Sequence, residues 1–316
     1  YQVTATTAGG GTVTIEPKQD NYLTGTKVKV TATPNEGWKF MGWAGDTGLN
    51  AQLRQGLIAY WPLDEINGEK TPELVNGYDM ELTNLTSNDL VEGKKGNAFS
   101  FSAEKETLLS RVHDEGDELP ANKHESFTIS MWSKVDGNGQ NDLRLFSEAH
   151  SGSINSGEDD NPLFNIGTDP GGDNGSVDLY IRQAGWDTVS HINSTAEPYD
   201  GEWHHVVFVQ ENNQRRLYVD GVLDDLQIPA KPEGTFKLND TTIGGILRSS
   251  ATHWVTGLID EVAIWKRALT NSEISQLVQN PALGDLVFAV KGDTDVSAQF
   301  GTGLSFKALG KGEVKV

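Results

Sequence analysis

The sequence of 316 residues contains no cysteine, which excludes disulfide bonds, thiolate nucleophiles and cysteine-ligated zinc. It also lacks any apolar run that approaches the ~18 residues of a membrane-spanning helix. Basic residues are few: 25 Lys and Arg stand against 45 Asp and Glu, for a net charge of −20. Such a charge repels nucleic acid and anionic membranes and attracts cations. We therefore expect no nucleic-acid partner and no insertion into a membrane.

Turn-forming residues, by contrast, are abundant. The chain has 35 Gly and 11 Pro, and its short runs of Val, Ile, Thr and Phe are bounded by Gly, Asn, Asp or Pro. This pattern predicts an all-β protein with many turns. The acids either form a solvated surface that keeps the protein soluble or, in part, hold Ca²⁺. Because the chain starts at Tyr1 and stops at Val316 within a strand-like pattern, we expect a monomeric fragment of a longer, secreted or cell-surface protein.

The end of the chain repeats its beginning. Residues 304–316 align without gaps with residues 3–15, so that the alternating segment 313–316 falls on the segment 12–15. Similarity at a fixed offset indicates tandem repeats, and the long interval indicates that another domain is inserted in the first copy. We predict a discontinuous β repeat from residues 1–50 and 281–302, an insert at 51–280, and the start of a further, truncated repeat at 303–316.

The first 46 residues carry the motifs of a known repeat. Three glycines at positions 9–11 join two alternating segments in a hairpin pattern, and the run GWKFMGW follows at 37–43. These segments resemble the divergent internalin B-type repeat of bacterial surface and secreted proteins. The resemblance implies a closing strand that ends in Ala-x-Phe, and this pattern is found at residues 298–300.

The insert has the pattern of a jelly roll. Many short strand-like segments alternate with polar turns, which predicts a two-sheet β sandwich. Five motifs occur in order: AYWPLD at 59–64, FTISMW at 127–132, GEWHHV at 201–206, LYVDG at 217–221 and GLIDEVAIW at 257–265. They resemble the laminin-G-like, concanavalin A-type jelly roll, and the resemblance implies that the first and last strands are neighbours. The predicted fold is therefore all-β: a two-sheet jelly-roll sandwich plus a small discontinuous β repeat domain.

A short helix is predicted to close the insert. Thr270 and Glu273 have the spacing of a capping box, and Leu269 and Ile274 have that of a hydrophobic staple. The helix should run to about residue 279 and stop before Pro281, because a proline restricts the residue that precedes it.

The jelly-roll resemblance also implies a structural Ca²⁺ that joins the exit of the first strand to the last strand. It points to Asp64 and Asp260, with Asn76 in the loop that returns from the first strand. Ca²⁺ takes six to eight oxygen ligands, many of them backbone carbonyls, so two carboxylates and a loop suffice. The alternative is that these aspartates only cap turns.

Catalysis is not expected of this chain. Hydrolases on this scaffold need two acids aligned on one strand face, whereas Asp260 and Glu261 are adjacent and point to opposite faces. His204 and His205 diverge for the same reason, and they match a structural strand of the family. Activity as a polysaccharide lyase or glycoside hydrolase therefore ranks third among the functions considered.

A glycan is the expected ligand. The alternation in residues 177–182 places Tyr180 and Arg182 on the face opposite the apolar side chains. With Trp186 they would form a platform for a sugar, and Arg182 and Arg248 would supply positive charge to an anionic polysaccharide. Each of these residues could instead lie on a solvated strand face or pack down from a loop. The predicted ligand-binding residues are Tyr180, Arg182, Trp186, Arg248, His253 and Trp254.

These observations together predict a non-catalytic carbohydrate-binding or adhesion module of a secreted or surface bacterial protein, with polysaccharide as partner and Ca²⁺ as a structural ion. The first alternative is a structural spacer or protein-adhesion element that binds no glycan.

Overall fold

The computed structural model describes residues 1–36, 38–45, 53–152, 162–172, 174–183, 186–231, 237–279, 286–289 and 294–302. Contacts within the chain divide it into two units, residues 1–51 with 284–316 and residues 52–283. The predicted boundaries near residues 50 and 281 and the predicted truncated repeat at 303–316 lie outside the described residues. In the part that is described, no helix combines the length and the apolar character needed to cross a membrane.

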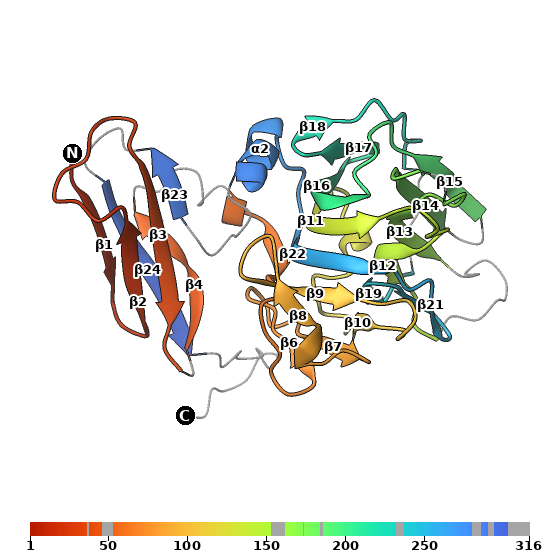
Figure 1. Cartoon of the computed structure of the whole chain (residues 1–316), viewed down its shortest axis with the longest axis horizontal. Helices are drawn as coiled ribbons and strands as arrows, with labels where there is room; N and C mark the ends of the chain where they lie inside the picture. The colour runs from red at the N-terminus through yellow and green to blue at the C-terminus, as the bar shows by residue number, and fades with distance from the viewer. Residues whose placement is uncertain are drawn as a thin grey trace. The chain divides into compact units, whose positions relative to one another are not determined.

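The first unit is built from two three-stranded sheets, ordered β1-β24-β4 and β2-β3-β23 (Figure 1). Its strands are β1 (Val3–Thr7), β2 (Gly11–Glu16), β3 (Lys27–Pro34), β4 (Trp38–Gly45), β23 (Leu286–Ala289) and β24 (Thr294–Thr302). Strands from the two ends of the chain pair within both sheets: Thr7 is the register partner of Ala298, and Val30 that of Leu286. The C-terminal segment therefore completes the sheets that the N-terminal segment begins.

Alternation of apolar residues explains the core of this unit. Val28 and Val30 are fully buried two positions apart on β3, as expected for one face of a strand. They form a cluster with Tyr22 and Ala298, and residues of β1 and β2 pack against it. Trp38 covers Gly10, where a Cβ would lie 2.7 Å from the indole Cδ2, but 39% of Trp38 remains exposed. The backbone of the Gly-rich turn thus comes closer to the ring than any other residue type would permit.

The second unit contains the other named elements of the described residues. They are β5 (Leu57–Trp61), β6 (Lys70–Thr71), β7 (Met80–Thr83), η1 (Ser87–Asp89), β8 (Leu90–Glu92), β9 (Asn97–Phe101), β10 (Leu108–Val112), η2 (Ala121–Lys123), β11 (Phe127–Asp136), β12 (Arg144–Ala149), β13 (Leu163–Thr168), β14 (Val177–Gln183), β15 (Trp186–Asn193), β16 (Asp200–Glu211), β17 (Gln214–Val219), β18 (Val222–Leu223), β19 (Asp240–Ile243), β20 (Ile246–Leu247), β21 (Ala251–Thr252), β22 (Gly257–Trp265) and α2 (Asn271–Gln279).

These strands form two eight-stranded sheets that pack face to face. The β14 sheet has the order β15-β14-β13-β12-β19-β10-β7-β6, and the β11 sheet has the order β18-β17-β16-β11-β22-β9-β8, with β5 beside β22. Phe164 of the β14 sheet meets Phe208 and Phe127 of the β11 sheet, at ring-centroid distances of 5.0 and 6.0 Å. Each such buried side chain stabilises the fold by about 1.5–3 kcal/mol. The predicted all-β jelly-roll sandwich is confirmed.

The first and last strands of the jelly roll are neighbours, as the sequence predicted. Trp61 of β5 pairs with Val262 of β22 in an antiparallel register. Helix α2 then begins as expected: the Thr270 hydroxyl accepts the N–H of Glu273, and the Glu273 carboxylate accepts the N–H of Thr270. A capping residue of this kind stabilises a helix by about 1 kcal/mol. The helix contributes Ile274 and Leu277 to an apolar cluster on the outer face of the β11 sheet.

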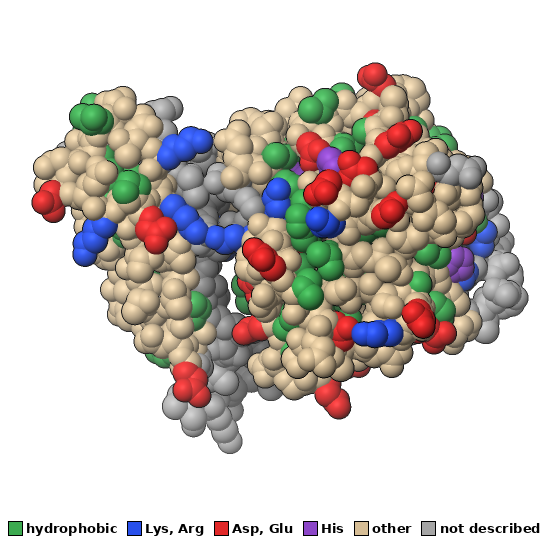
Figure 2. Space-filling model, viewed as in Figure 1, with side chains coloured by type: hydrophobic (Ala, Val, Ile, Leu, Met, Phe, Trp, Pro, Cys, Tyr) green, Lys and Arg blue, Asp and Glu red, His purple; other side chains and the backbone are tan. Residues whose placement is uncertain are grey.

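Charged side chains of both signs lie on the face of the jelly roll that Figure 2 shows. Asp and Glu side chains are scattered across the visible face of the jelly roll, with Lys and Arg among them (Figure 2). This distribution is typical of a solvated acidic surface.

Candidate functional site

The outer face of the β14 sheet carries a group of polar residues. On β14, Val177, Leu179 and Ile181 are buried in the core between the sheets. Asp178, Tyr180 and Arg182 therefore face the other way, as the alternation predicted. The neighbouring strands extend this face, because Asn165 of β13 is the register partner of Tyr180, and Arg144 of β12 that of Gly167.

A hairpin formed by β20 and β21 lies over this face. Gly244 starts it with φ +88°, and a Cβ at this position would overlap the ring of Phe101, so glycine is required there. Ile246 at the start of the hairpin packs against Ala149 and Leu163 of the sheet, and Tyr180 packs beside them. The backbone N–H of Arg144 donates to the carbonyl of His253 at 2.9 Å. These contacts bring Arg248 and His253 to the side chains on β12–β14.

Strands and hairpin line a small, partly open cavity of about 50 Å³, which we call the arginine pocket. Its lining residues are Asp142, Arg144, Leu163, Asn165, Tyr180, Ile246, Arg248 and His253. A site for a whole drug-sized ligand has about 300–1,000 Å³. The arginine pocket can therefore accept one substituent of a larger ligand, while the rest of that ligand lies on the surface.

Asn165, which lines the pocket, is a buried polar group without a hydrogen-bond partner among the described residues. Its exposed fraction is 0%, and neither the Nδ2 nor the Oδ1 atom has a hydrogen-bond partner among the described residues. Leaving such a group unsatisfied costs about 1–3 kcal/mol of stability. A ligand that accepts from the Nδ2 atom, or donates to the Oδ1 atom, would reduce this cost.

Two arginines surround the ring of Tyr180. The guanidinium carbon of Arg182 lies 5.4 Å from the ring centroid and that of Arg144 lies 5.9 Å from it. Arg182 also donates to the Tyr180 hydroxyl, and Arg144, which is 3% exposed, donates to Asp142. The ring of Tyr180 stacks on the imidazole of His191, with a centroid distance of 4.2 Å and an interplanar angle of 14°. Tyr180 therefore contacts both arginines, and the imidazole of His191 covers one face of its ring.

Positive charge is concentrated at the pocket. Burial lowers the pKa of Arg248, and the charges of Arg144 and Arg182 lower it further. Burial likewise lowers the pKa of His253, with Arg144 adding to the effect, so the imidazole is neutral at pH 7. Three guanidinium groups thus interact on one face of a chain whose net charge is −20.

Two aspartates balance part of this charge. Asp178 is fully buried, and its Oδ2 atom lies 3.0 Å from Nδ1 of His191. Burial raises the pKa of Asp178 to about 6, although the charge of His191 opposes the rise. Potential metal-ligand atoms of three residues lie within 4.8 Å of one another, namely those of Asp142, Asp178 and His191. The nearby arginines oppose a cation at this position, so we assign these residues to orienting the pocket.

The structure brings four of the six predicted ligand-binding residues together. Tyr180, Arg248 and His253 line the pocket, and Arg182 reaches it through Tyr180. Trp186 is the first residue of β15 and the register partner of Gln183 on β14. Its side chain lies outside the described residues.

Trp254, the remaining predicted residue, lies beside the pocket and is partly buried. Its backbone bridges to Arg144, and a Cβ at Gly245 would be 3.2 Å from the indole Cδ1, so the ring packs onto the hairpin. Sequence reasoning missed Asp142, Arg144 and Asn165. The alternation on β13, where Phe164 and Ile166 flank Asn165, was a signal that could have found the last of these.

A larger groove of about 650 Å³ lies at the β6–β7 edge of the sheet. Its charged residues include Lys70 and Glu81, which form an ion pair at 3.4 Å with both side chains about half exposed or more. An exposed pair of this kind is solvated and contributes little. We place the candidate site at the smaller pocket, because it contains a buried amide that has no partner in the part of the chain that the structure describes.

The two predicted metal-binding aspartates meet at one turn. The Oδ1 atom of Asp64 accepts the N–H of Asn97 at 2.7 Å, and Oδ2 of Asp260 accepts the N–H of Lys95 at 3.0 Å. Glycines form the turn between them: a Cβ at Gly93 would lie 2.7 Å from Oδ2 of Asp260, and one at Gly96 would overlap Asp64. Burial raises the pKa of Asp260 to about 7, and the charge of Asp64 adds to this.

This arrangement fits a hard cation. Two carboxylates lie near enough to repel each other, in a cradle that a side chain on either glycine would fill, and oxygen atoms are the ligands that Ca²⁺ prefers.

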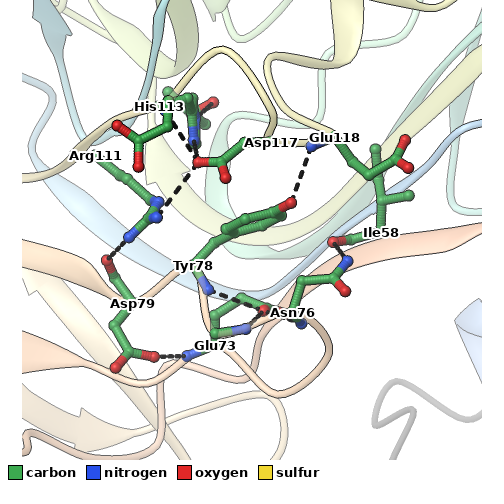
Figure 3. Close-up of polar contacts among 12 residues, drawn as sticks. Ile58, Glu73, Asn76, Tyr78, Asp79, Arg111, His113, Asp117 and Glu118 are labelled. Atoms are coloured by element: carbon green, nitrogen blue, oxygen red, sulfur yellow. Dashed lines mark hydrogen bonds and ion pairs between the residues drawn. The ribbon is translucent and has the colours of Figure 1, made fainter. Parts of the chain in front are cut away.

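Asn76 lies in a different turn (Figure 3). Its side-chain amide donates to the carbonyl of Ile58 at 2.8 Å. The buried carboxylate of Glu73 holds this turn by accepting backbone N–H groups from Tyr60, Val75, Asn76, Gly77 and Tyr78. Among the described residues Asn76 makes no hydrogen bond to Asp64 or Asp260. The prediction of a metal site therefore depends on the two aspartates and the 93–97 turn.

Comparisons with known proteins agree with this architecture. The family model of the concanavalin A-like lectin/glucanases superfamily matches residues 112–275, and that of the divergent InlB B-repeat domain matches residues 1–55. Both resemblances predicted from the sequence are thereby confirmed.

Individual proteins match over part of their length. Human adhesion G-protein coupled receptor D1 is 27% identical over 230 residues, which are 71% of this chain and 24% of the receptor. The sialidase of Trypanosoma rangeli, solved with 2,3-difluoro-KDN, has a TM-score of 0.53 at 15% identity, covering 73% of this chain and 33% of the sialidase. A structure titled HCR/D W1238A mutant has a TM-score of 0.51 at 13% identity, covering 74% of this chain and 53% of that one. At such identities the structural likeness shows the fold alone.

Proposed function

The chain belongs to the concanavalin A-like lectin/glucanases superfamily, and on this premise we propose that its jelly roll is a non-catalytic module that binds a glycan at the arginine pocket. The observation that carries the proposal is Asn165, a fully buried amide with no partner among the described residues. Glycan sites hold sugar hydroxyls with planar polar side chains of this kind. We further propose a secreted or cell-surface bacterial protein as the setting, supported by the InlB B-repeat match and the similarity to an adhesion receptor.

The shape of the pocket supports binding rather than catalysis. A glycosidase needs two carboxyl groups that flank a glycosidic bond, with room for a sugar ring on each side. Asp142 and Asp178 are near each other, but Asp142 is paired with Arg144, and Asp178 is fully buried beside His191. A cavity of about 50 Å³ holds no sugar ring between them. An assay for new reducing ends on a polysaccharide panel tests this point, and any turnover would contradict it.

We also propose that Asp64 and Asp260 hold a structural Ca²⁺. The ion would offset the repulsion between the carboxylates and join the exit of β5 to β22, the first and last strands of the jelly roll. Its chemistry would be charge neutralisation and oxygen coordination, without activation of water. The support is the glycine cradle at residues 93 and 96 and the buried position of Asp260.

A glycan array with the 316-residue chain tests the binding proposal, and affinity gels with a polysaccharide panel provide the titration. His253→Ala removes one pocket group and should weaken binding about 5- to 10-fold, which is the worth of one neutral hydrogen bond. His204→Ala is the matched control, because His204 lies on β16 of the other sheet and contacts Asp200 and Asp220. The control should bind as the wild type does.

Two results would count against a glycan-binding module. Binding to no glycan, in Ca²⁺ or in chelator, would favour the alternative of a structural spacer or protein-adhesion element, for which pull-down of protein partners is the test. Equal losses in the His253→Ala and His204→Ala variants would place the binding surface elsewhere on the molecule.

A further inference from the structure

We propose that the arginine pocket receives the carboxylate of an acidic sugar, so that the glycan bound by this chain is a polyuronate or another carboxylated polysaccharide. This inference rests on the proposed glycan-binding function and adds the chemical class of the ligand. It is carried by the size of the pocket, the donors that line it and the local balance of charge.

Size restricts what can enter the pocket. A water molecule needs about 10–15 Å³ of such space, so the cavity of about 50 Å³ has room for a group of three or four heavy atoms. A carboxylate has this size, whereas a sugar ring does not. The ring that carries the carboxylate would lie outside, against the hairpin residues Arg248 and His253.

The lining supplies donors of the kind that a carboxylate requires. Arg144 and Arg248 line the same cavity as the Asn165 amide. A guanidinium group presents a planar fork of N–H donors that matches the two oxygens of a carboxylate, and such charge-assisted bonds are about twice as strong as neutral ones. The Nδ2 atom of Asn165 is a further donor without a partner among the described residues.

Charge on this face also favours an anion. Burial lowers the pKa of Arg248, and the nearby charges of Arg144 and Arg182 lower it further. The acidic groups that face them are Asp142 and Asp178, of which Asp142 pairs with Arg144 and Asp178 with His191. The Nε2 atom of His253 lies 3.6 Å from the Oδ2 atom of Asp142. A ligand carboxylate would relieve the mutual repulsion of the guanidinium groups.

A neutral sugar would not satisfy this pocket. Its hydroxyls would leave partly desolvated guanidinium groups facing one another, and a site built for a charged group rejects an analogue that lacks it. Long-range attraction cannot explain binding of a polyanion either, because the net charge of −20 repels it. Selectivity for acidic glycans would therefore report on the pocket itself.

Calorimetric titration of the full chain tests the inference with matched ligands. The probes are uronate oligosaccharides that contain galacturonate, glucuronate or mannuronate, each beside the same oligosaccharide with its carboxylates reduced to alcohols. We expect at least one acidic oligosaccharide to bind 10-fold or more tightly than its reduced form. Arg248→Met should lower that affinity about 10- to 100-fold, as expected for a hydrogen bond to a charged group. Arg248→Lys should restore only part of it, because an ammonium group lacks the planar fork.

The control and the opposing outcomes separate this inference from the proposed function. Arg216→Met removes the same charge from β17 of the other sheet, where Arg216 contacts Glu211, and should leave binding unchanged. Equal affinity for acidic and reduced forms would overturn the carboxylate assignment and leave glycan binding intact. Stronger binding of dextran sulfate than of every uronate would overturn it in favour of sulfate. No binding to any glycan would refute both proposals.

Discussion

Replacing Asn165 by leucine should make the protein more stable and less able to bind its ligand. Asn165 is 0% exposed, and both polar atoms of its amide lack a partner among the described residues. An unsatisfied buried polar group costs about 1–3 kcal/mol. Leucine has a similar branched shape and no polar atom, so Asn165→Leu should recover this energy. For a domain of this size 1 kcal/mol corresponds to about 2–4 °C, which predicts a rise in Tm of about 2–12 °C.

Scanning calorimetry and the glycan titration, run on the same preparations, provide the measurement. Ser147→Ala is the matched control. Ser147 is the register partner of Asn165 on β12, and its hydroxyl is also fully buried without a partner among the described residues, but it does not line the pocket. The control should gain a little stability and keep full binding. Of the two variants, only Asn165→Leu should gain stability and lose binding.

The reasoning fails if Asn165→Leu lowers the free energy of unfolding by 1 kcal/mol or more. That result would mean that the amide is satisfied in solution and stabilises the fold. If Asn165→Leu binds the glycan as tightly as the wild type does, Asn165 takes no part in recognition, whatever the stability of the variant.

Three further predictions concern stability. Burial raises the pKa of Asp240 to about 8, and the charge of Glu148 adds to this rise. Because the pKa of Asp240 is higher in the folded state than in the unfolded state, its contribution to stability is fully present below pH ~4 and is lost as the pH rises through 8. Thermal unfolding should therefore show that Asp240→Asn is more stable than the wild type at pH 8 and that this advantage shrinks toward pH 5; a constant difference would refute the assignment. Ca²⁺ at 100 times its Kd should stabilise the wild type by about 2.7 kcal/mol but not Asp64→Asn, and a chelator should reverse the effect; equal shifts in both proteins would place the ion elsewhere. A fragment of residues 52–279 should fold alone, whereas residues 1–51 alone should not, because β23 and β24 complete both of their sheets; circular dichroism of the two fragments decides the point.

Local patterns in the sequence were sufficient for much of the architecture. Alternation in residues 177–182 placed Tyr180 and Arg182 opposite the core face, because successive side chains of a strand must point to opposite sides. The spacing of Thr270 and Glu273 located the start of α2 for a similarly local reason. The near-repeat of residues 3–15 at the end of the chain indicated an interrupted unit, and β1 does pair with β24.

The candidate site depended on tertiary structure. Arg144, Asn165 and Arg248 come from three separate segments, and no local rule relates them. They meet because strand register places Asn165 beside Tyr180, and because the turn at Gly244 directs a hairpin over that face. Asn76 illustrates the opposite case: it follows the first strand, yet the carboxylate of Glu73 holds it in a turn, and among the described residues it makes no hydrogen bond to Asp64 or Asp260. Sequence determined which residues each strand presents, since side-chain direction is a property of the backbone, whereas only the packing of strands and hairpin decided which of them share a pocket.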